Sequence, residues 1–150
     1  MIDQTDLRII KELTKNGRIT MKELGEKVHL TGQAASSRVL RLEEEGIIEG
    51  YSIKVDKSKM GYAVHCFLTI YTRNIPHTTY LSYIKTKEEY VLKNYKISGD
   101  GCYLLECRFP SNKELDEFLV QLNEHVNYKL SIVINEAAAS LDNLQIKWKH

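Results

Sequence analysis

The sequence predicts an α+β protein, in which a helical N-terminal domain precedes a domain of alternating strands and helices. Apolar residues recur at a helical period of about 3.6 as far as Leu42, and after Gly46 the period changes to two, as in strands. The 150 residues are 43% hydrophobic and 27% charged, which suits one mid-sized or two small folded domains. The net charge of +1 neither favours nor excludes nucleic acid, so a basic surface has to be local.

The first 28 residues predict two short helices. An apolar face of Leu7, Ile10 and Leu13 marks the first helix, with Asp3 or Thr5 as its N-cap. A capping-box pattern and a short apolar face mark the second helix; they are formed by Thr20 with Glu23 and by Met21, Leu24 and Val28.

A third helix is predicted over residues 33–45, after a tight connection at residues 29–32. Its inward residues are Ala35, Val39 and Leu42. Two short helices joined by a tight turn are typical of a helix-turn-helix, whose second helix enters the major groove of DNA. A plain three-helix bundle with a solvated polar face is the alternative interpretation.

The outward face of this third helix carries side chains that can bond DNA. Between Gln33 and Leu42 there are two arginines and no acid. Arginine binds guanine bidentately and glutamine binds adenine, while polar groups near the groove edge bind phosphate. The predicted DNA-binding residues are Thr20, Lys22, Gln33, Ser36, Ser37, Arg38, Arg41 and Lys54.

Residues 47–56 alternate, with Tyr51, Ile53 and Val55 on one face. They predict a small hairpin, or a single strand that leads to a linker at residues 57–61. The DNA-binding domain is therefore predicted to span residues 1–56 and the second domain residues 62–150.

The second domain is predicted to have the order βαββαβ of a ferredoxin-like fold. Its strands are expected at residues 63–73, 90–98, 102–109 and 128–138. One helix is expected to have Pro76 in its first turn, and Ser111 is expected to cap the other. The tail at residues 139–150 has no clear assignment.

No metal or catalytic site is predicted. Cys102 and Cys107 are expected on opposite faces of one strand, where they cannot share a metal. They and Cys66 are interpreted as reduced, half-buried thiols, with redox sensing by Cys102 as the alternative. His65 is expected on the strand face opposite Cys66, as an ordinary packed histidine.

The chain is predicted to be cytoplasmic. No apolar run approaches the roughly 18 residues of a membrane span, and the first residues do not resemble a signal peptide. No enzyme is predicted, because the sequence holds no Ser/His/Asp set, phosphate-binding glycine loop or paired acids. An activity on the ferredoxin-like half is nevertheless a third hypothesis, because that fold hosts many activities.

Several segments resemble the Lrp/AsnC family of transcriptional regulators. They are RITMKELG from Arg18, LTGQAASSRVLRLE from Leu30 and GIIEGY from Gly46, followed by Asp56, Met60 with Gly61, and SGDGCYLL from Ser98. The resemblance covers nearly the whole chain in the right order. It implies an N-terminal winged helix-turn-helix and a C-terminal ligand-sensing domain, with dimers that form through the C-terminal sheet and often assemble into DNA-wrapping octamers.

The resemblance also implies an amino-acid effector at the turn of residues 99–101, where the interpretation from the residues alone is a simple hairpin turn. The predicted effector-binding residues are Ser98, Gly99, Asp100, Gly101, Cys102, Tyr103, Ile134 and Glu136. The family usually has an acidic residue, which holds the effector's amino group, where this chain has Cys102. Asp100 remains, in a different register.

Together these observations predict a transcriptional regulator that binds double-stranded DNA as a homodimer or octamer. Beyond an amino acid or other small-molecule effector, no cofactor, metal or membrane partner is expected. The alternative is an architectural, nucleoid-associated protein that wraps DNA without an effector.

Overall fold

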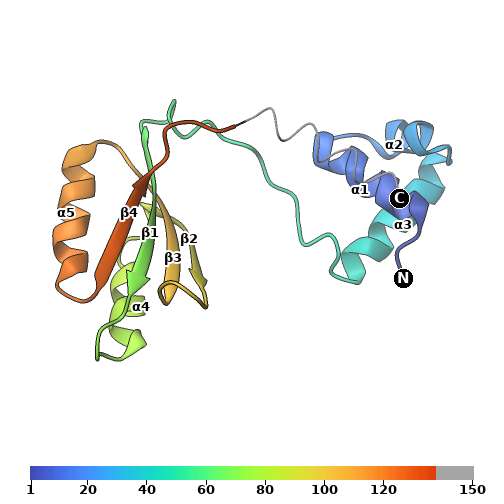
Figure 1. Ribbon diagram of the computed structural model, residues 1–150. Coiled ribbons are helices and arrows are strands. Elements are labelled where there is room, and N and C mark those ends of the chain that lie inside the picture. The colour runs from blue at the N-terminus through green and yellow to red at the C-terminus, as the bar shows by residue number, and fades with distance from the viewer. Residues whose placement is uncertain (138–150) are drawn as a thin grey trace. The chain divides into compact units, whose positions relative to one another are not determined.

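The computed structural model describes residues 1–137, which form two compact units, Met1–Lys54 and Val55–Glu136 (Figure 1). The first unit contains three helices: α1 (Gln4–Lys15), α2 (Met21–Val28) and α3 (Gly32–Glu44). Within residues 1–137 we find no helix that combines the length and the hydropathy needed to cross a membrane.

Side-chain caps define where these helices begin. Asp3 caps α1: its carboxylate accepts a hydrogen bond from the Asp6 backbone N–H at 2.8 Å, and the Asp6 carboxylate accepts one from the Asp3 N–H at 3.2 Å. Thr20 and Thr31 cap α2 and α3 through their hydroxyls, which accept hydrogen bonds from the backbone N–H groups of Glu23 and Ala34. Each cap satisfies an N–H that has no partner inside its helix.

The turn between α2 and α3 is tight because its backbone passes very close to Gly25. A Cβ at this position would lie 2.6 Å from the Leu30 carbonyl oxygen, and the Leu30 N–H donates to the Gly25 carbonyl at 2.8 Å. His29 has a φ of 61°, in the left-handed region, and so reverses the chain. The predicted helix-turn-helix geometry is therefore present. The core beneath it consists of Ile9, Ile19, Leu24, Val28, Ala35, Val39 and Leu42.

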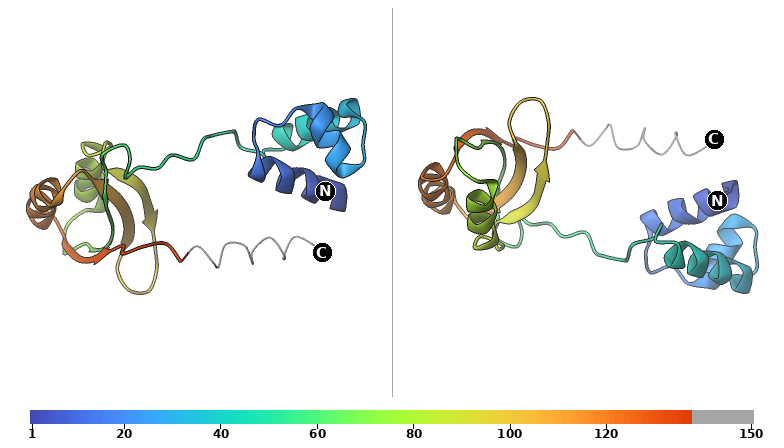
Figure 2. Two further views of the ribbon diagram at one scale, coloured as in Figure 1. Left: turned by 90° about the horizontal axis from the view of Figure 1, so that it is seen from above. Right: turned by 90° about the horizontal axis from the view of Figure 1, so that it is seen from below.

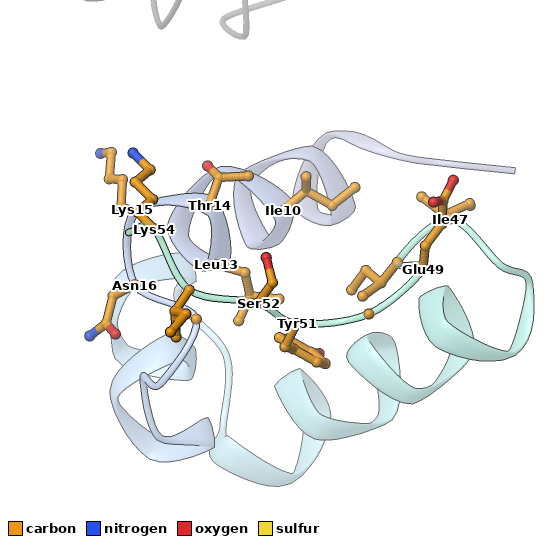
Figure 3. A pocket seen from close by; sticks show the side chains of 14 residues that line it. Ile10, Leu13, Thr14, Lys15, Asn16, Ile47, Glu49, Tyr51, Ser52 and Lys54 are labelled. Carbon is orange, nitrogen blue, oxygen red and sulfur yellow. The ribbon is translucent and has the colours of Figure 1, made fainter. Parts of the chain in front are cut away.

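The prediction of a hairpin or strand at residues 47–56 is wrong for this structure: the segment is extended but belongs to no sheet. A strand needs hydrogen bonds to a neighbouring strand, and no other strand of residues 1–137 pairs with it. The Tyr51 hydroxyl instead donates to Glu43 at 2.9 Å. As Figure 3 shows, the segment runs beside α1, where the two line a groove of about 630 Å³.

The second unit has the predicted ferredoxin-like order. Its elements are β1 (Val64–Tyr71), α4 (His77–Lys85), β2 (Val91–Lys96), β3 (Tyr103–Phe109), α5 (Asn112–Asn123) and β4 (Asn127–Ile132). The strands form one antiparallel sheet in the order β2-β3-β1-β4, and α4 and α5 cover one of its faces (Figure 2). Fold class is therefore confirmed.

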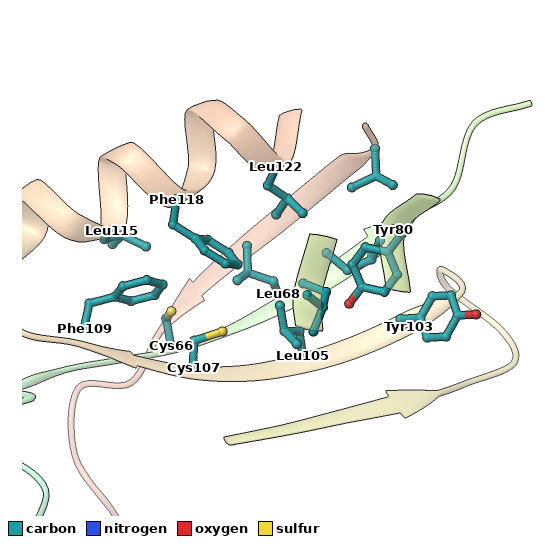
Figure 4. Close-up of a cluster of buried hydrophobic side chains, with 13 residues drawn as sticks. Cys66, Leu68, Tyr80, Tyr103, Leu105, Cys107, Phe109, Leu115, Phe118 and Leu122 are labelled. Carbon is teal, nitrogen blue, oxygen red and sulfur yellow. The ribbon is translucent and has the colours of Figure 1, made fainter. Parts of the chain in front are cut away.

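The core of this unit lies between the sheet and its two helices (Figure 4). Burial alternates strictly along β3, because successive strand residues point to opposite faces. The rings of Phe109 and Phe118 lie 5.1 Å apart, measured between their centroids.

Two of the three cysteines, Cys66 and Cys107, are fully buried in this core. Burial raises the pKa of the Cys66 thiol to about 11 and raises that of the Cys107 thiol further. Both are structural thiols.

Two strand ends differ from the prediction. The last strand ends at Ile132 rather than at residue 138, and the Val133 N–H makes one further bond to His65. In the register that pairs Ile132 with Cys66, β1 begins at Val64 and so has no residue opposite positions 135–138. Ile134 therefore lies after the sheet. Cys102 lies in the turn before β3 rather than within the strand. Residue 138 and the tail at residues 139–150 lie outside the described residues.

Candidate nucleic-acid interface and ligand turn

The outer face of α3 carries three of the predicted DNA-binding residues. Gln33, Ser36 and Ser37 are exposed, on the side of the helix opposite its buried face of Ala35, Val39 and Leu42. Leu40, which the sequence analysis did not single out, is 54% exposed and falls on the same helical face. The face is thus uncharged and rich in short side chains, so that a nucleic-acid groove can approach the helix backbone.

The two arginines of α3 lie at the flank of this face and are held by acids of α1. One Arg38 guanidinium nitrogen lies 2.8 and 2.7 Å from the two Asp3 carboxylate oxygens and 3.1 Å from Asp6. Arg41 donates to the other oxygen of Asp6. The Asp6 side chain is fully buried, whereas that of Asp3 is 54% exposed.

These ion pairs shift the pKa values of both partners. Hydrogen bonds from Arg38, then from the Asp6 backbone, lower the pKa of Asp3 to about 2. The bonds to Asp3 and Asp6 raise the pKa of Arg38. The local charge of +2 expected for α3 is therefore compensated inside the unit. The acids come 32 to 35 residues earlier in the chain, so local charge counting misses them.

The remaining predicted DNA contacts border α3 or follow it. Thr20 caps α2 and also donates to the Glu23 carboxylate at 3.0 Å, so its hydroxyl is already engaged. Lys22 is exposed, and its backbone lies against Gly32 at the start of α3. Lys54 is exposed and lines the groove between α1 and the segment that follows α3. Within residues 1–137, neither lysine forms an ion pair.

The turn at residues 98–103 is packed against the end of β1. The Cys102 N–H donates to the Ile70 carbonyl at 2.7 Å. Gly101 has a φ of 91°, and a Cβ there would lie 2.5 Å from Thr69 Cγ2. Only glycine fits this site without displacing β1.

Asp100, the acid that remains in this turn, is already partnered. Its carboxylate accepts a hydrogen bond from the Tyr71 hydroxyl at 2.9 Å and lies 3.7 Å from the Lys129 ammonium. The bond to Asp100 raises the pKa of Tyr71. A ligand ammonium would therefore compete with Lys129 for this carboxylate.

Comparison with known proteins decides the family. A protein-family profile described as winged helix-turn-helix DNA-binding matches residues 2–49. The transcriptional regulator LrpA of Bacillus subtilis is 58% identical over 136 residues, which cover 91% of this chain and all of that protein. The chain belongs to the Lrp/AsnC family of transcriptional regulators. The resemblance found in the sequence is confirmed, and this Lrp/AsnC regulator is a DNA-binding protein.

Solved structures match most of the chain. The structure of B. subtilis LrpC matches this Lrp/AsnC regulator with a TM-score of 0.85 at 32% identity, covering 91% of this chain and 96% of that one. A feast or famine regulatory protein of M. tuberculosis, complexed with L-methionine, matches with a TM-score of 0.82 at 28% identity, covering 91% and 95%.

A hydrogen-bonded cluster joins the turn of this Lrp/AsnC regulator to the start of α4. Thr72 bonds the Cys102 sulfur and His77 Nε2, both at 3.2 Å, and His77 Nδ1 bonds the Tyr103 hydroxyl at 2.9 Å. The Thr72 hydrogen bond lowers the pKa of Cys102. The predicted strand residues Ile134 and Glu136 are instead exposed beyond β4.

The sheet face opposite α4 and α5 carries a second polar cluster. His65 Nε2 lies 2.6 Å from Glu106, and Arg108 lies 3.4 Å from His65 Nδ1. Half-buried Phe67 and Leu104 extend this face. Among residues 1–137, no group of histidine, cysteine or acidic side chains could hold a metal ion.

Proposed function

We propose that this Lrp/AsnC regulator reads double-stranded DNA with the outer face of α3 and binds as a homodimer or higher oligomer. The observation that carries the proposal is the exposed, uncharged face of Gln33, Ser36 and Ser37 above a fully buried apolar stripe. A rigid helix with short hydrogen-bonding groups suits the major groove. Gln33 and the serines would contact base edges.

Phosphate contacts would come from the rim of this face. Lys22, beside the start of α3, and Lys54 are exposed cations. Arg38 and Arg41 lie at the opposite flank. The Thr20 hydroxyl is a further candidate, which would give up its bond to the Glu23 carboxylate for one to phosphate. Phosphate contacts fix the register of the helix, and the outer face then supplies selectivity.

Self-association would use the sheet face that α4 and α5 leave open. Phe67 and Leu104 are only half-buried there, and Tyr95 is 49% exposed. A two-fold pair of chains would present two α3 helices to successive major grooves, about 34–36 Å apart. We assign no enzymatic activity to the chain and place the regulator in the cytoplasm, at the nucleoid.

The turn at residues 98–103 is proposed to contact an amino acid or another small-molecule effector. The M. tuberculosis relative that matches this chain is complexed with L-methionine. Exposed Asp100 and the backbone of the glycine turn provide polar groups for such a ligand. Because Lys129 and Tyr71 share Asp100, an effector ammonium would bind in competition with Lys129.

Footprinting on the region upstream of its own gene tests the DNA-binding proposal. We expect discrete protected sites, in pairs about one helical turn apart, which Gln33→Ala and Ser37→Ala weaken while the mass in solution stays that of an oligomer. Uniform protection that neither substitution alters would contradict selective reading by α3 and favour the architectural alternative.

A thermal-shift screen of the amino acids tests the effector. A ligand that binds only the folded protein raises its unfolding temperature in a concentration-dependent way. We expect at least one amino acid to do so, and we expect Asp100→Asn to reduce the shift. If no amino acid shifts the transition, the effector assignment fails while DNA binding by α3 stands.

A further inference from the structure

Arg38 has two acidic partners that differ in exposure. The Asp6 side chain is fully buried and also binds Arg41. The Asp3 side chain is 54% exposed, and that of Arg38 is 32% exposed. Solvent, and any anion in it, therefore reaches the Asp3–Arg38 pair but not the Asp6 carboxylate.

We infer that Asp3 competes with a DNA phosphate for Arg38, so that this N-terminal carboxylate limits the DNA affinity of the regulator. The inference rests on the proposed function, in which α3 lies in the major groove. Arg38 directly follows Ser37 in the chain and lies at the flank of the outer face, and a groove wall that contacts Ser37 brings phosphates near this flank.

When a DNA phosphate replaces the Asp3 carboxylate at Arg38, one singly charged anion replaces another. A guanidinium donates to carboxylate and phosphate oxygens alike, so the exchange takes place at the Arg38 nitrogen that now contacts Asp3. The Asp3 carboxylate then keeps its N-cap bond from the Asp6 N–H and is solvated where it contacted Arg38. Asp6 stays in place, because a fully buried carboxylate that loses its cations is left as an uncompensated buried charge. Each DNA contact by Arg38 is thus weakened by the free energy of its bond to Asp3.

Asp3→Asn is the test, because asparagine keeps the N-cap of α1 while it removes the charge. We expect the affinity for a footprinted site to rise about three- to tenfold. We also expect the slope of log K against log salt to steepen by up to about one. In the parent, the Asp3 carboxylate takes up a cation when DNA displaces it from Arg38, whereas asparagine does not. The matched control is Glu26→Gln, which removes one charge from α2 without touching either arginine.

A double substitution isolates the role of Arg38. If Asp3 acts through Arg38, Asp3→Asn has no effect on affinity in an Arg38→Gln background. Asp3→Ser, a second uncharged cap, should reproduce Asp3→Asn, and thermal unfolding establishes that each variant is folded.

Two results would overturn the inference: an Asp3→Asn affinity that is no higher than the parent's, or an equal gain in the Arg38→Gln background. Both are distinct from failure of the proposed function, in which Gln33→Ala and Ser37→Ala leave DNA binding unchanged.

Discussion

The two predicted ligand sites, the outer face of α3 and the turn at residues 98–103, are built in different ways. The α3 face projects into solvent from a helix whose other side is buried. The turn lies against β1, with no room for a Cβ at Gly101. A residue of the α3 face can therefore change without altering the fold, whereas part of the turn belongs to the packing of its unit.

The two sites also share a property. The charged groups of α3 and of the turn that were expected to bind a ligand are already paired within the chain: Arg38 with acids of α1, and Asp100 with Tyr71 and Lys129. In α3 the uncharged side chains remain free to read DNA, but in the turn the only acid is shared. A ligand must therefore displace an internal partner at either site to use its charge.

The largest expected effect is on stability, and it should differ between two glycines of the turn. Gly99 and Gly101 both have positive φ, but Gly99 has open space where Gly101 meets Thr69 and the Ile70 carbonyl. We expect Gly101→Ala to lower the free energy of unfolding by about 3 kcal/mol, from backbone strain plus overpacking, and Gly99→Ala by about 1 kcal/mol from strain alone. Urea denaturation measures both, and equal losses would show that the turn is not packed against β1 as described.

The next effect concerns the α3 face. Ser37→Glu places a carboxylate where DNA phosphates would lie, and like charges across an interface cost several kcal/mol. We expect DNA binding to weaken about 100-fold with little change in stability. The control, Ser82→Glu, makes the same change at an exposed position of α4 in the other unit. If the two variants bound DNA equally well, α3 would not be the reading helix.

The sequence predicts those features that depend on neighbours along the chain. The caps at Asp3, Thr20 and Ser111, the outward face of α3 and the βαββαβ order all follow from local period and capping chemistry. Each lies within a few residues of the signal that predicts it.

The features that were missed depend on distant or absent partners. The acids that hold Arg38 and Arg41 come 32 to 35 residues before them, and no local pattern links the two. Residues 47–56 alternate like a strand, but alternation does not supply the second strand that a hairpin needs. The predicted last strand is too long because a strand extends only as far as its pairing with a neighbour, here β1, and alternation along the chain does not show where that pairing stops.

A smaller effect is expected in the reactivity of the cysteines, which differs between the turn and the core of the second unit. Cys102 is half-buried and its pKa is lowered by Thr72, whereas Cys66 and Cys107 are buried with raised pKa values. We expect iodoacetamide to label Cys102 at least about tenfold faster at neutral pH, because the thiolate is the reactive form. Mass spectrometry after proteolysis identifies the site. Thr72→Val should slow the reaction, and equal labelling of all three thiols in the folded protein would contradict this account.

The smallest effect is the pH dependence of the Asp3–Arg38 pair. The pKa of Asp3 falls from an ordinary 3.8 to about 2 in the folded protein. A lowered carboxyl pKa stabilises the fold above the ordinary value, and this stabilisation is lost as the pH falls toward the folded value. The parent should therefore be slightly more stable than Asp3→Asn at pH 5, and the difference should shrink between pH 3.8 and about 2. Urea midpoints of the two proteins across this range measure the difference in stability.

Because the other carboxylates titrate in both proteins, only the difference between the parent and Asp3→Asn reports on Asp3. A difference that is constant with pH would mean that Arg38 does not hold this carboxylate in solution, and the competition with DNA phosphate would lose its basis.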